Sequence, residues 1–206
     1  MLDKLIIEFD RGLRTLFAPA HSLRPHPDEG IPEATLTEQE KRHVRGLMRV
    51  NHCGEICAQA LYQGQALTAQ SKEARAELNQ AANEEIEHLA WTERRIRELR
   101  GRVSFLNPLW YSGSLAIGLS VGLLGEKWNL GFLEETERQV EAHLTKHLGN
   151  LPAHDQKSQA IVSKMRDDER EHANLARKLG AVDLPAPIKI AMKYTARLMT
   201  NASYYL

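Results

Sequence analysis

The sequence predicts an all-α protein in which four long helices form a bundle, with a further helix near each end of the chain. Apolar residues recur along the chain with the period of an α-helix. No segment alternates apolar and polar residues with the period of a strand followed by a hairpin turn. The 206 residues have the length of one ordinary domain, so we expect a single domain over 1–206.

The composition argues against several classes of protein. Lys and Arg total 27, as do Asp and Glu, so the net charge is zero and gives no reason to expect a nucleic-acid partner. Hydrophobic residues make up 42% of the chain, which is enough for a packed core. Cys53 and Cys57 have a helical i, i+4 spacing that is typical of reduced thiols. Asp3, Glu8 and Asp10 argue against a signal or transit peptide, so we expect a location facing the cytosol.

The first part of the chain predicts a short amphipathic helix over residues 1–17, followed by a connector over 18–36. Seven apolar residues of the helix recur at helical spacing: Leu2, Leu5, Ile6, Phe9, Leu13, Leu16 and Phe17. Prolines then interrupt any regular element at positions 19, 25, 27 and 32. We expect the connector to be a linker inside one domain rather than a domain boundary.

The predicted bundle occupies residues 37–179 and contains four helices. Thr37 and Glu40 have the spacing of a capping box, which predicts that the first bundle helix begins there and runs to about Gln70. Gly149 with Pro152 marks the end of the third helix. The other three bundle helices are expected at about 71–101, 128–148 and 155–179.

The bundle includes an apolar segment, 103–125, in which none of the 23 residues carries a formal charge. This length alone permits a helix that crosses a bilayer. Pro108 shortens the helical part, however, and several serines and glycines dilute the hydrophobicity. We therefore expect a helix that lies partly in a membrane interface, with a buried crossover helix and a true membrane span as alternatives.

The C-terminal segment, 180–206, is predicted to be a basic amphipathic helix. No acidic residue follows Asp183, and Lys189, Lys193 and Arg197 recur every four positions on one helical face. This pattern is typical of a helix that rests on anionic lipid. The alternative is a terminal helix that packs on the bundle and leaves a basic edge in solvent.

Two copies of a Glu-x-x-His motif indicate a metal centre. Each motif follows a single glutamate, at a distance of 30 residues in the first case and 32 in the second. Because residues i and i+3 lie on one face of a helix, each motif can bind one metal while a carboxylate bridges to another. The candidate ligands are Glu55, Glu85, His88, Glu137, Glu169 and His172. Four Glu and two His from four helices is the donor set of di-iron carboxylate bundles.

The apolar pattern of each helix supports this selection. All six candidates lie on the predicted core-facing stripes, whereas acidic neighbours such as Glu84 and Asp168 lie outside them. An ionised carboxylate in the interior costs several kcal/mol, and four together would repel one another. No Lys or Arg lies on these stripes, so cations are the simplest compensation. One imidazole per metal among carboxylates suits iron or manganese better than zinc.

Any single Glu-x-x-His is more often an exposed pair with a solvated charge, and only the four matched stripes together favour the metal centre. The other histidines carry no such pattern. His52 and His143 adjoin the stripes and are candidates for groups near the metal or substrate, although a helix-surface position is the simpler expectation. His147 is expected to face solvent.

Four short segments of the chain resemble a known family. These are 49–55 (Arg-Val-Asn-His-Cys-Gly-Glu), 83–88 (Asn-Glu-Glu-Ile-Glu-His), 107–110 (Asn-Pro-Leu-Trp) and 168–172 (Asp-Glu-Arg-Glu-His). The chain resembles the demethoxyubiquinol hydroxylases of ubiquinone biosynthesis, which are ferritin-like di-iron monooxygenases. The resemblance extends from about Glu38 to the C-terminus and implies a ferritin-like four-helix bundle with a long apolar crossover. It also implies two iron ions per chain, bound by the six residues that the stripes select.

The resemblance implies a substrate and a location as well. The substrate would be 2-polyprenyl-3-methyl-6-methoxy-1,4-benzoquinol, hydroxylated on its ring with O2 to give demethylubiquinol. A polyprenyl tail is nearly insoluble in water, so we expect a peripheral protein on the cytoplasmic face of the cell membrane. A homo-oligomer, or association with other quinone-biosynthesis proteins, is compatible with this interpretation. The alternatives are a ferritin-like protein that oxidises or stores iron and a membrane-associated helical scaffold.

Overall fold

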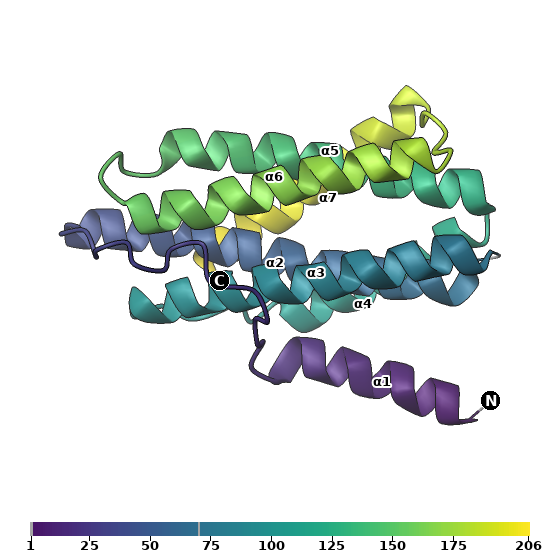
Figure 1. Ribbon diagram of the computed structural model, residues 1–206, viewed down its shortest axis with the longest axis horizontal. Helices are drawn as coiled ribbons and strands as arrows, with labels where there is room; N and C mark the ends of the chain where they lie inside the picture. Colours follow the sequence, from purple (N-terminus) through teal and green to yellow (C-terminus); the bar gives the residue numbers. More distant parts are fainter. Residues whose placement is uncertain (1, 70) are drawn as a thin grey trace.

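The structure is a computed structural model that describes residues 2–69 and 71–206. These residues form seven α-helices and contain no strand (Figure 1). The helices are α1 (Leu2–Phe17), α2 (Glu38–Thr68), α3 (Lys72–Glu98), α4 (Asn107–Gly122), α5 (Glu126–Asn150), α6 (Gln156–Lys178) and α7 (Ala186–Tyr205). The all-α fold predicted from the sequence is confirmed. Gln70, the predicted end of the first bundle helix, lies outside the described residues.

Side-chain caps fix where two of the bundle helices begin. The Thr37 hydroxyl accepts a hydrogen bond from the backbone N–H of Glu40 at 3.2 Å, and the Glu40 carboxylate accepts from the backbone N–H of Thr37 at 2.8 Å. This is the capping box that the sequence predicts for α2. Asp155 caps α6 in the same sense, because its carboxylate accepts from the backbone N–H of Ser158.

The bundle consists of two helix pairs. α2 packs along α3, and α5 packs along α6, with the α5–α6 pair above the α2–α3 pair in Figure 1. Contacts of α3 with α6 and of α2 with α5 join the two pairs. The contacts are consistent with the ferritin-like fold that the resemblance implies.

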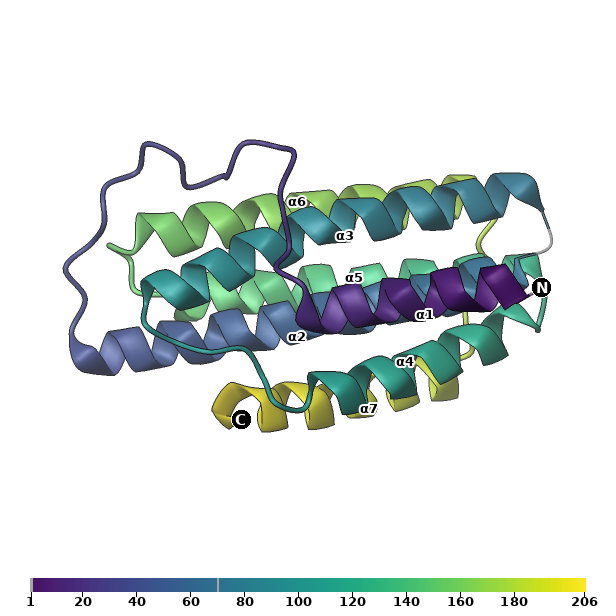
Figure 2. The same ribbon diagram turned by 90° about the horizontal axis from the view of Figure 1, so that it is seen from below.

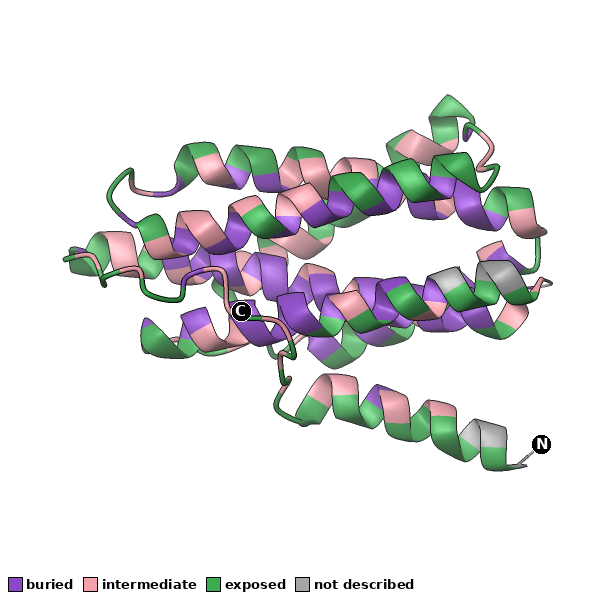
Figure 3. Ribbon diagram, in the orientation of Figure 1, coloured by how far each residue is buried: buried purple, intermediate pink, exposed green. Residues whose placement is uncertain are grey.

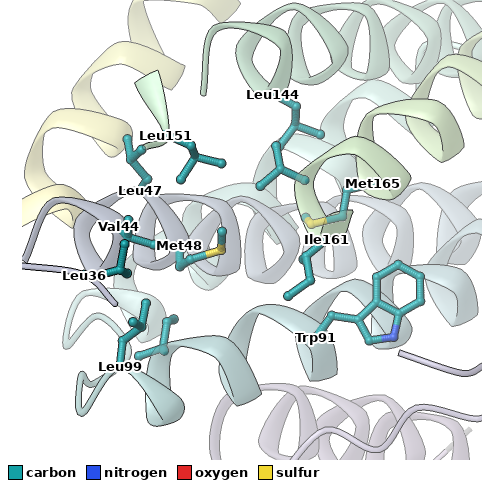
Figure 4. Close-up of a cluster of buried hydrophobic side chains, with 12 residues drawn as sticks. Leu36, Val44, Leu47, Met48, Trp91, Leu99, Leu144, Leu151, Ile161 and Met165 are labelled. Carbon is teal, nitrogen blue, oxygen red and sulfur yellow. The ribbon is translucent and has the colours of Figure 1, made fainter. Parts of the chain in front are cut away.

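Two apolar clusters fill the bundle, one toward each end, and buried residues line the inward faces of its helices (Figure 3). Figure 4 shows the first cluster, to which α2 contributes Met48, α3 Trp91 and α6 Met165. The second cluster includes Leu61 of α2 and Leu130 of α5. On each bundle helix, the candidate metal ligands lie between the residues of these two clusters. The packing therefore places the ligands in the interior of the bundle, between the two clusters.

α4, which covers most of the apolar segment 103–125, lies along the outside of the bundle against α2. Gly64 of α2 and Gly118 of α4 allow the two backbones to approach, since a Cβ on Gly64 would lie 2.6 Å from the carbonyl oxygen of Leu115. The opposite face of α4 exposes apolar side chains such as Leu109 and Ile117. No helix within the described residues is both long enough and apolar enough to cross a membrane.

Substitution of Gly118 tests this close crossing. A Cβ at position 118 would overlap the carbonyl oxygen of Leu61, so Gly118→Val is expected to lower the free energy of unfolding by about 2–4 kcal/mol. Gly113 lies on the same helix, and a Cβ there would meet open space. Gly113→Ala is therefore the matched control and should stabilise the protein by about 0.5–1 kcal/mol. Urea unfolding of the two variants measures the difference, and equal stabilities would contradict the close crossing.

α1 is amphipathic, as predicted, and its apolar face points away from the bundle. Phe9 and Phe17 are each 70% exposed, and Ile6 is exposed beside them. The opposite face contacts α2 and α4, which lie beside α1 in Figure 2. On this face Gly12 packs on the Tyr111 ring. The Gln63 side-chain amide also donates to the backbone carbonyl of Glu8 at 2.8 Å.

α7 packs along α2 near the C-terminus. The Tyr204 ring fills the space above Gly46, and the Arg49 guanidinium donates to the Tyr204 carbonyl oxygen at 2.7 Å. The other side of α7 exposes apolar residues, including Tyr194 and Leu198. α7 is therefore attached to the bundle and also presents an apolar surface outward.

Candidate metal centre

The four bundle helices bring the six predicted ligands together. α2 supplies Glu55, α3 supplies Glu85 and His88, α5 supplies Glu137, and α6 supplies Glu169 and His172. All six residues are buried. They form two overlapping groups, Glu55–Glu85–His88–Glu169 and Glu85–Glu137–Glu169–His172, in each of which the donor atoms lie within 4.8 Å of one another. Each group can hold a metal ion, and Glu85 and Glu169 belong to both.

The two imidazoles face the centre in the same way. Nδ1 of His88 lies 3.0 Å from Oε2 of Glu85 and 3.3 Å from Oε1 of Glu169. Nδ1 of His172 lies 3.3 Å from Oε2 of Glu169 and 3.5 Å from Oε1 of Glu85. Both rings therefore turn Nδ1 toward Glu85 and Glu169, the two carboxylates that belong to both groups.

Buried oxygen atoms with few or no donors fit the binding of metal ions. Oε1 of Glu137 is buried and has no hydrogen-bond donor. Oε1 of Glu169 and Oε1 of Glu85 are also buried, and each has only a contact with a histidine Nδ1, at 3.3 Å and 3.5 Å. A buried carboxylate oxygen without a donor is costly, and a bound cation removes that cost. Carboxylate oxygens with one imidazole for each group are donors that suit iron and manganese.

Burial and mutual repulsion raise the pKa values of Glu55 and Glu137, the two carboxyl groups that each belong to only one metal-binding group. Desolvation raises the pKa of Glu55 well above its ordinary value, and repulsion from Glu85 adds to it. Desolvation and repulsion from Glu169 likewise raise the pKa of Glu137. For Glu169, burial alone would raise the pKa, but hydrogen bonds from His172 and His88 outweigh burial and lower the pKa to about 2.

The pKa values of the two histidines are also raised, but by their carboxylate neighbours rather than by burial. Burial disfavours the charged imidazolium of His172, but hydrogen bonds to Glu169 and Glu84 outweigh burial and raise its pKa to about 11. The pKa of His88 is also raised, because Glu85, Asp168 and the other carboxylates around it outweigh its desolvation. Protons on these rings therefore offset part of the negative charge of the carboxylates in the metal-free centre.

Two carboxylates that were expected to point outward contact the histidines instead. Nε2 of His88 on α3 donates to Asp168 on α6 at 3.1 Å, and Nε2 of His172 on α6 donates to Glu84 on α3 at 2.5 Å. The expectation for these two acids was wrong because each reaches across to the neighbouring helix. A carboxylate on the outer nitrogen of a metal-binding imidazole fixes its orientation. The repeated acid-Glu-x-x-His pattern was the available sequence signal.

The expectation of surface positions was also wrong for other histidines. His52 on α2 and His147 on α5 are buried, and His143 is half-buried. Desolvation lowers the pKa of His52 to about 4 and that of His147 to about 3, so both rings are neutral at neutral pH. None of the three belongs to the two metal-binding groups.

Fold and site together define a class: four-helix bundle proteins with carboxylate and histidine ligands for metal ions in their core. The sequence profile of the family described as ubiquinone biosynthesis protein COQ7 matches residues 42–203. This chain belongs to the COQ7 family.

Curated relatives are similar over their whole length. The 3-demethoxyubiquinol 3-hydroxylase of Chromobacterium violaceum is 68% identical over 204 residues, which cover 99% of each chain. The protein of the same name from Laribacter hongkongensis is 66% identical over 206 residues, which cover 100% of each chain. The one from Azoarcus sp. is 62% identical over 204 residues and covers 99% of each chain.

Proposed function

We propose that this protein is a 3-demethoxyubiquinol 3-hydroxylase of ubiquinone biosynthesis. Its substrate is 2-polyprenyl-3-methyl-6-methoxy-1,4-benzoquinol, and its product is the corresponding demethylubiquinol. One oxygen atom of O2 replaces a ring hydrogen with a hydroxyl group, and two electrons and two protons convert the other into water. The observation that carries the proposal is the pair of buried Glu/His groups that share two carboxylates. Full-length similarity to hydroxylases of this name supports it.

The proposal includes two iron ions per chain. Glu55 and His88 would hold one, Glu137 and His172 the other, and Glu85 and Glu169 would bridge them. Bound iron supplies the electron-transfer chemistry that O2 needs in order to react with an organic ring. The overlap of the two groups at the shared carboxylates supports this assignment.

The residues of the chain contribute geometry and a dry environment. Asp168 and Glu84 hold the two imidazoles in orientation through the outer ring nitrogens. Apolar clusters on both sides of the centre along the bundle shield it from bulk solvent, which strengthens the electrostatic interactions there. Bridging carboxylates suit this reaction because they can change their binding mode as the metal charge changes.

A single experiment separates this function from iron storage. The purified protein is loaded anaerobically with Fe(II), and demethoxyubiquinol, an electron donor and O2 are then added. We expect one hydroxylated quinol for each O2 consumed, measured by mass spectrometry with 18O2 to label the new hydroxyl group. Oxidation of many Fe(II) ions per chain without labelled quinol would instead indicate a ferritin-like iron-oxidising protein.

We also propose that the protein is peripheral on the cytoplasmic face of the cell membrane. Three helices around α2 present apolar side chains outward: Phe9 and Phe17 on α1, Leu109 and Ile117 on α4, and Tyr194 and Leu198 on α7. A polyprenyl substrate resides in the bilayer, so these exposed faces have a function if they contact lipid.

Liposome binding tests this location. Leu123 and Leu124, at the end of α4, are exposed and contribute little to packing. Replacing both with serine should weaken liposome binding by about tenfold or more, because each lost leucine removes at least about 1 kcal/mol of apolar transfer. Leu179→Ser, at the end of α6 on the far side of α2 from α4, is the matched control (Figure 1). Equal co-sedimentation of both variants would contradict the proposal.

A further inference from the structure

The outer sides of the two metal-binding groups differ. On the His88 side, the Asp168 carboxylate is 6% exposed and pairs with two cations, the Arg24 guanidinium at 3.1 Å and the Lys164 ammonium at 2.5 Å. On the His172 side, the Glu84 carboxylate is 35% exposed. Among the described side chains, the ion pair of Glu84 is with His172 itself.

A segment of the connector covers the His88 side. We call residues 20–24 the strap. In Figure 2 the connector that contains the strap crosses α3 and α6 on its way from α1 to α2. The Glu87 carboxylate accepts from the backbone N–H groups of Leu23 at 2.9 Å and Arg24 at 3.2 Å, and Trp91 donates to the Ser22 hydroxyl at 3.1 Å.

Arg24 connects the strap to the metal centre. Its guanidinium lies 4.7 Å from the centroid of the Trp91 ring and donates to Oδ2 of Asp168. The same oxygen accepts from Nε2 of His88. Arg24 thus acts on His88 through Asp168, as a positioning residue that holds the carboxylate and the imidazole in place.

The His172 side opens into a cavity. Its volume is about 160 Å³, and it lies between α3, α5 and α6. Its lining includes Glu84, His172, Leu133 and Ala81. Glu84, which is 35% exposed, and His172 thus both line this cavity, whereas the strap contacts Asp168 on the His88 side through Arg24.

We propose that the two metal positions are inequivalent: the position at Glu55 and His88 is closed by the strap, and the position at Glu137 and His172 is open to the cavity. This inference rests on the proposed pair of metal ions. Metal ions enter and leave the open position through the cavity, and Arg24 slows exchange at the closed one. Small ligands reach the centre from the open side.

The test measures metal release rather than activity. Protein loaded with two Co(II) ions per chain is mixed with excess EDTA, and the Co(II) absorbance is followed by stopped flow. We expect two phases of equal amplitude. Glu137→Ala should remove the fast phase and Glu55→Ala the slow phase, which assigns each phase to a position.

Variants of the strap and the cavity then change one phase at a time. Arg24→Gln should accelerate the slow phase about tenfold or more and change the fast phase much less, because the Arg24 charge acts on Glu84 without an ion pair between them. Arg24→Lys keeps a positive charge beside the Asp168 carboxylate. The rate of its slow phase should therefore be close to that of the unmodified protein. Ala81→Met should slow the fast phase by filling the cavity. Arg170→Gln, an exposed α6 residue that pairs with Asp167, is the matched control and should change neither phase.

Several outcomes would overturn the inference. Release in one phase would show that the positions are equivalent, and a slow phase unaffected by Arg24→Gln would exclude the strap as its cause. Loss of the slow phase in Glu137→Ala would reverse the assignment. Hydroxylation by a protein that releases both ions in one phase would refute only this inference, whereas two phases without hydroxylation would refute only the proposed function.

Discussion

Glu169→Ala is expected to remove both metal ions from the protein, whereas Glu137→Ala should remove only one. Glu169 belongs to both donor groups and lies 3.3 Å from Nδ1 of each histidine, so each group loses a shared ligand that contacts its imidazole. Glu137 belongs to the His172 group alone. Metal analysis after gel filtration should give two ions per chain for the unmodified protein, about one for Glu137→Ala and about none for Glu169→Ala. Hydroxylation should fall to background in both variants.

Asp167→Ala is the matched control for this pair of variants. Asp167 is on the same helix as Glu169, and its carboxylate pairs with Arg166 and Arg170 outside the metal centre. We expect this variant to keep both ions and its activity. Retention of two ions by Glu169→Ala would show that the ligand set is wrong, even if hydroxylation were lost.

Much of the fold follows from local sequence rules. Apolar periodicity and the Thr37–Glu40 capping box place α2, because these signals depend only on residues within one or two turns. The orientation of α1 does not follow from such rules. Amphipathicity identifies an apolar face, but only tertiary contacts such as those of Gly12 with Tyr111 decide which face the bundle takes.

The metal-binding residues can be predicted from the sequence more accurately than the residues that surround them. The core-facing stripes select Glu85 and His88 because a buried ligand must lie on the same helical face as the apolar core. The prediction that Asp168 points outward was wrong. An apolar stripe shows in which direction a side chain leaves the helix axis, but not how far away the next helix lies. The Asp168 side chain spans that distance and reaches His88. Arg24 lies outside the helices, so no helical periodicity in the sequence marks it. The backbone N–H groups that hold the strap to Glu87 also leave no mark in the sequence, because every residue except proline has one.

Loading the centre with metal should release several protons. The four carboxylates carry a total charge of −4, which four protons on the six ligands or two divalent cations reduce to zero. In the metal-free protein the pKa values of Glu55, Glu137 and His88 are raised, and that of His172 is about 11, so the empty centre binds more protons than the same side chains would in water. We expect more than one proton to be released per chain on loading. Calorimetry in two buffers of different ionisation enthalpy measures this number.

The same exchange sets the pH dependence of metal affinity. Protons are products of binding, so the apparent affinity for the metal pair should rise with pH by about tenfold per unit for each proton released, and fall as the solution becomes acidic. Glu137→Gln should release fewer protons, because glutamine has none to lose and the variant binds one ion fewer. Release of less than one proton per chain would show that the metal-free centre does not neutralise its carboxylates with protons. The bundle would then need another cation to keep four carboxylates in an apolar interior.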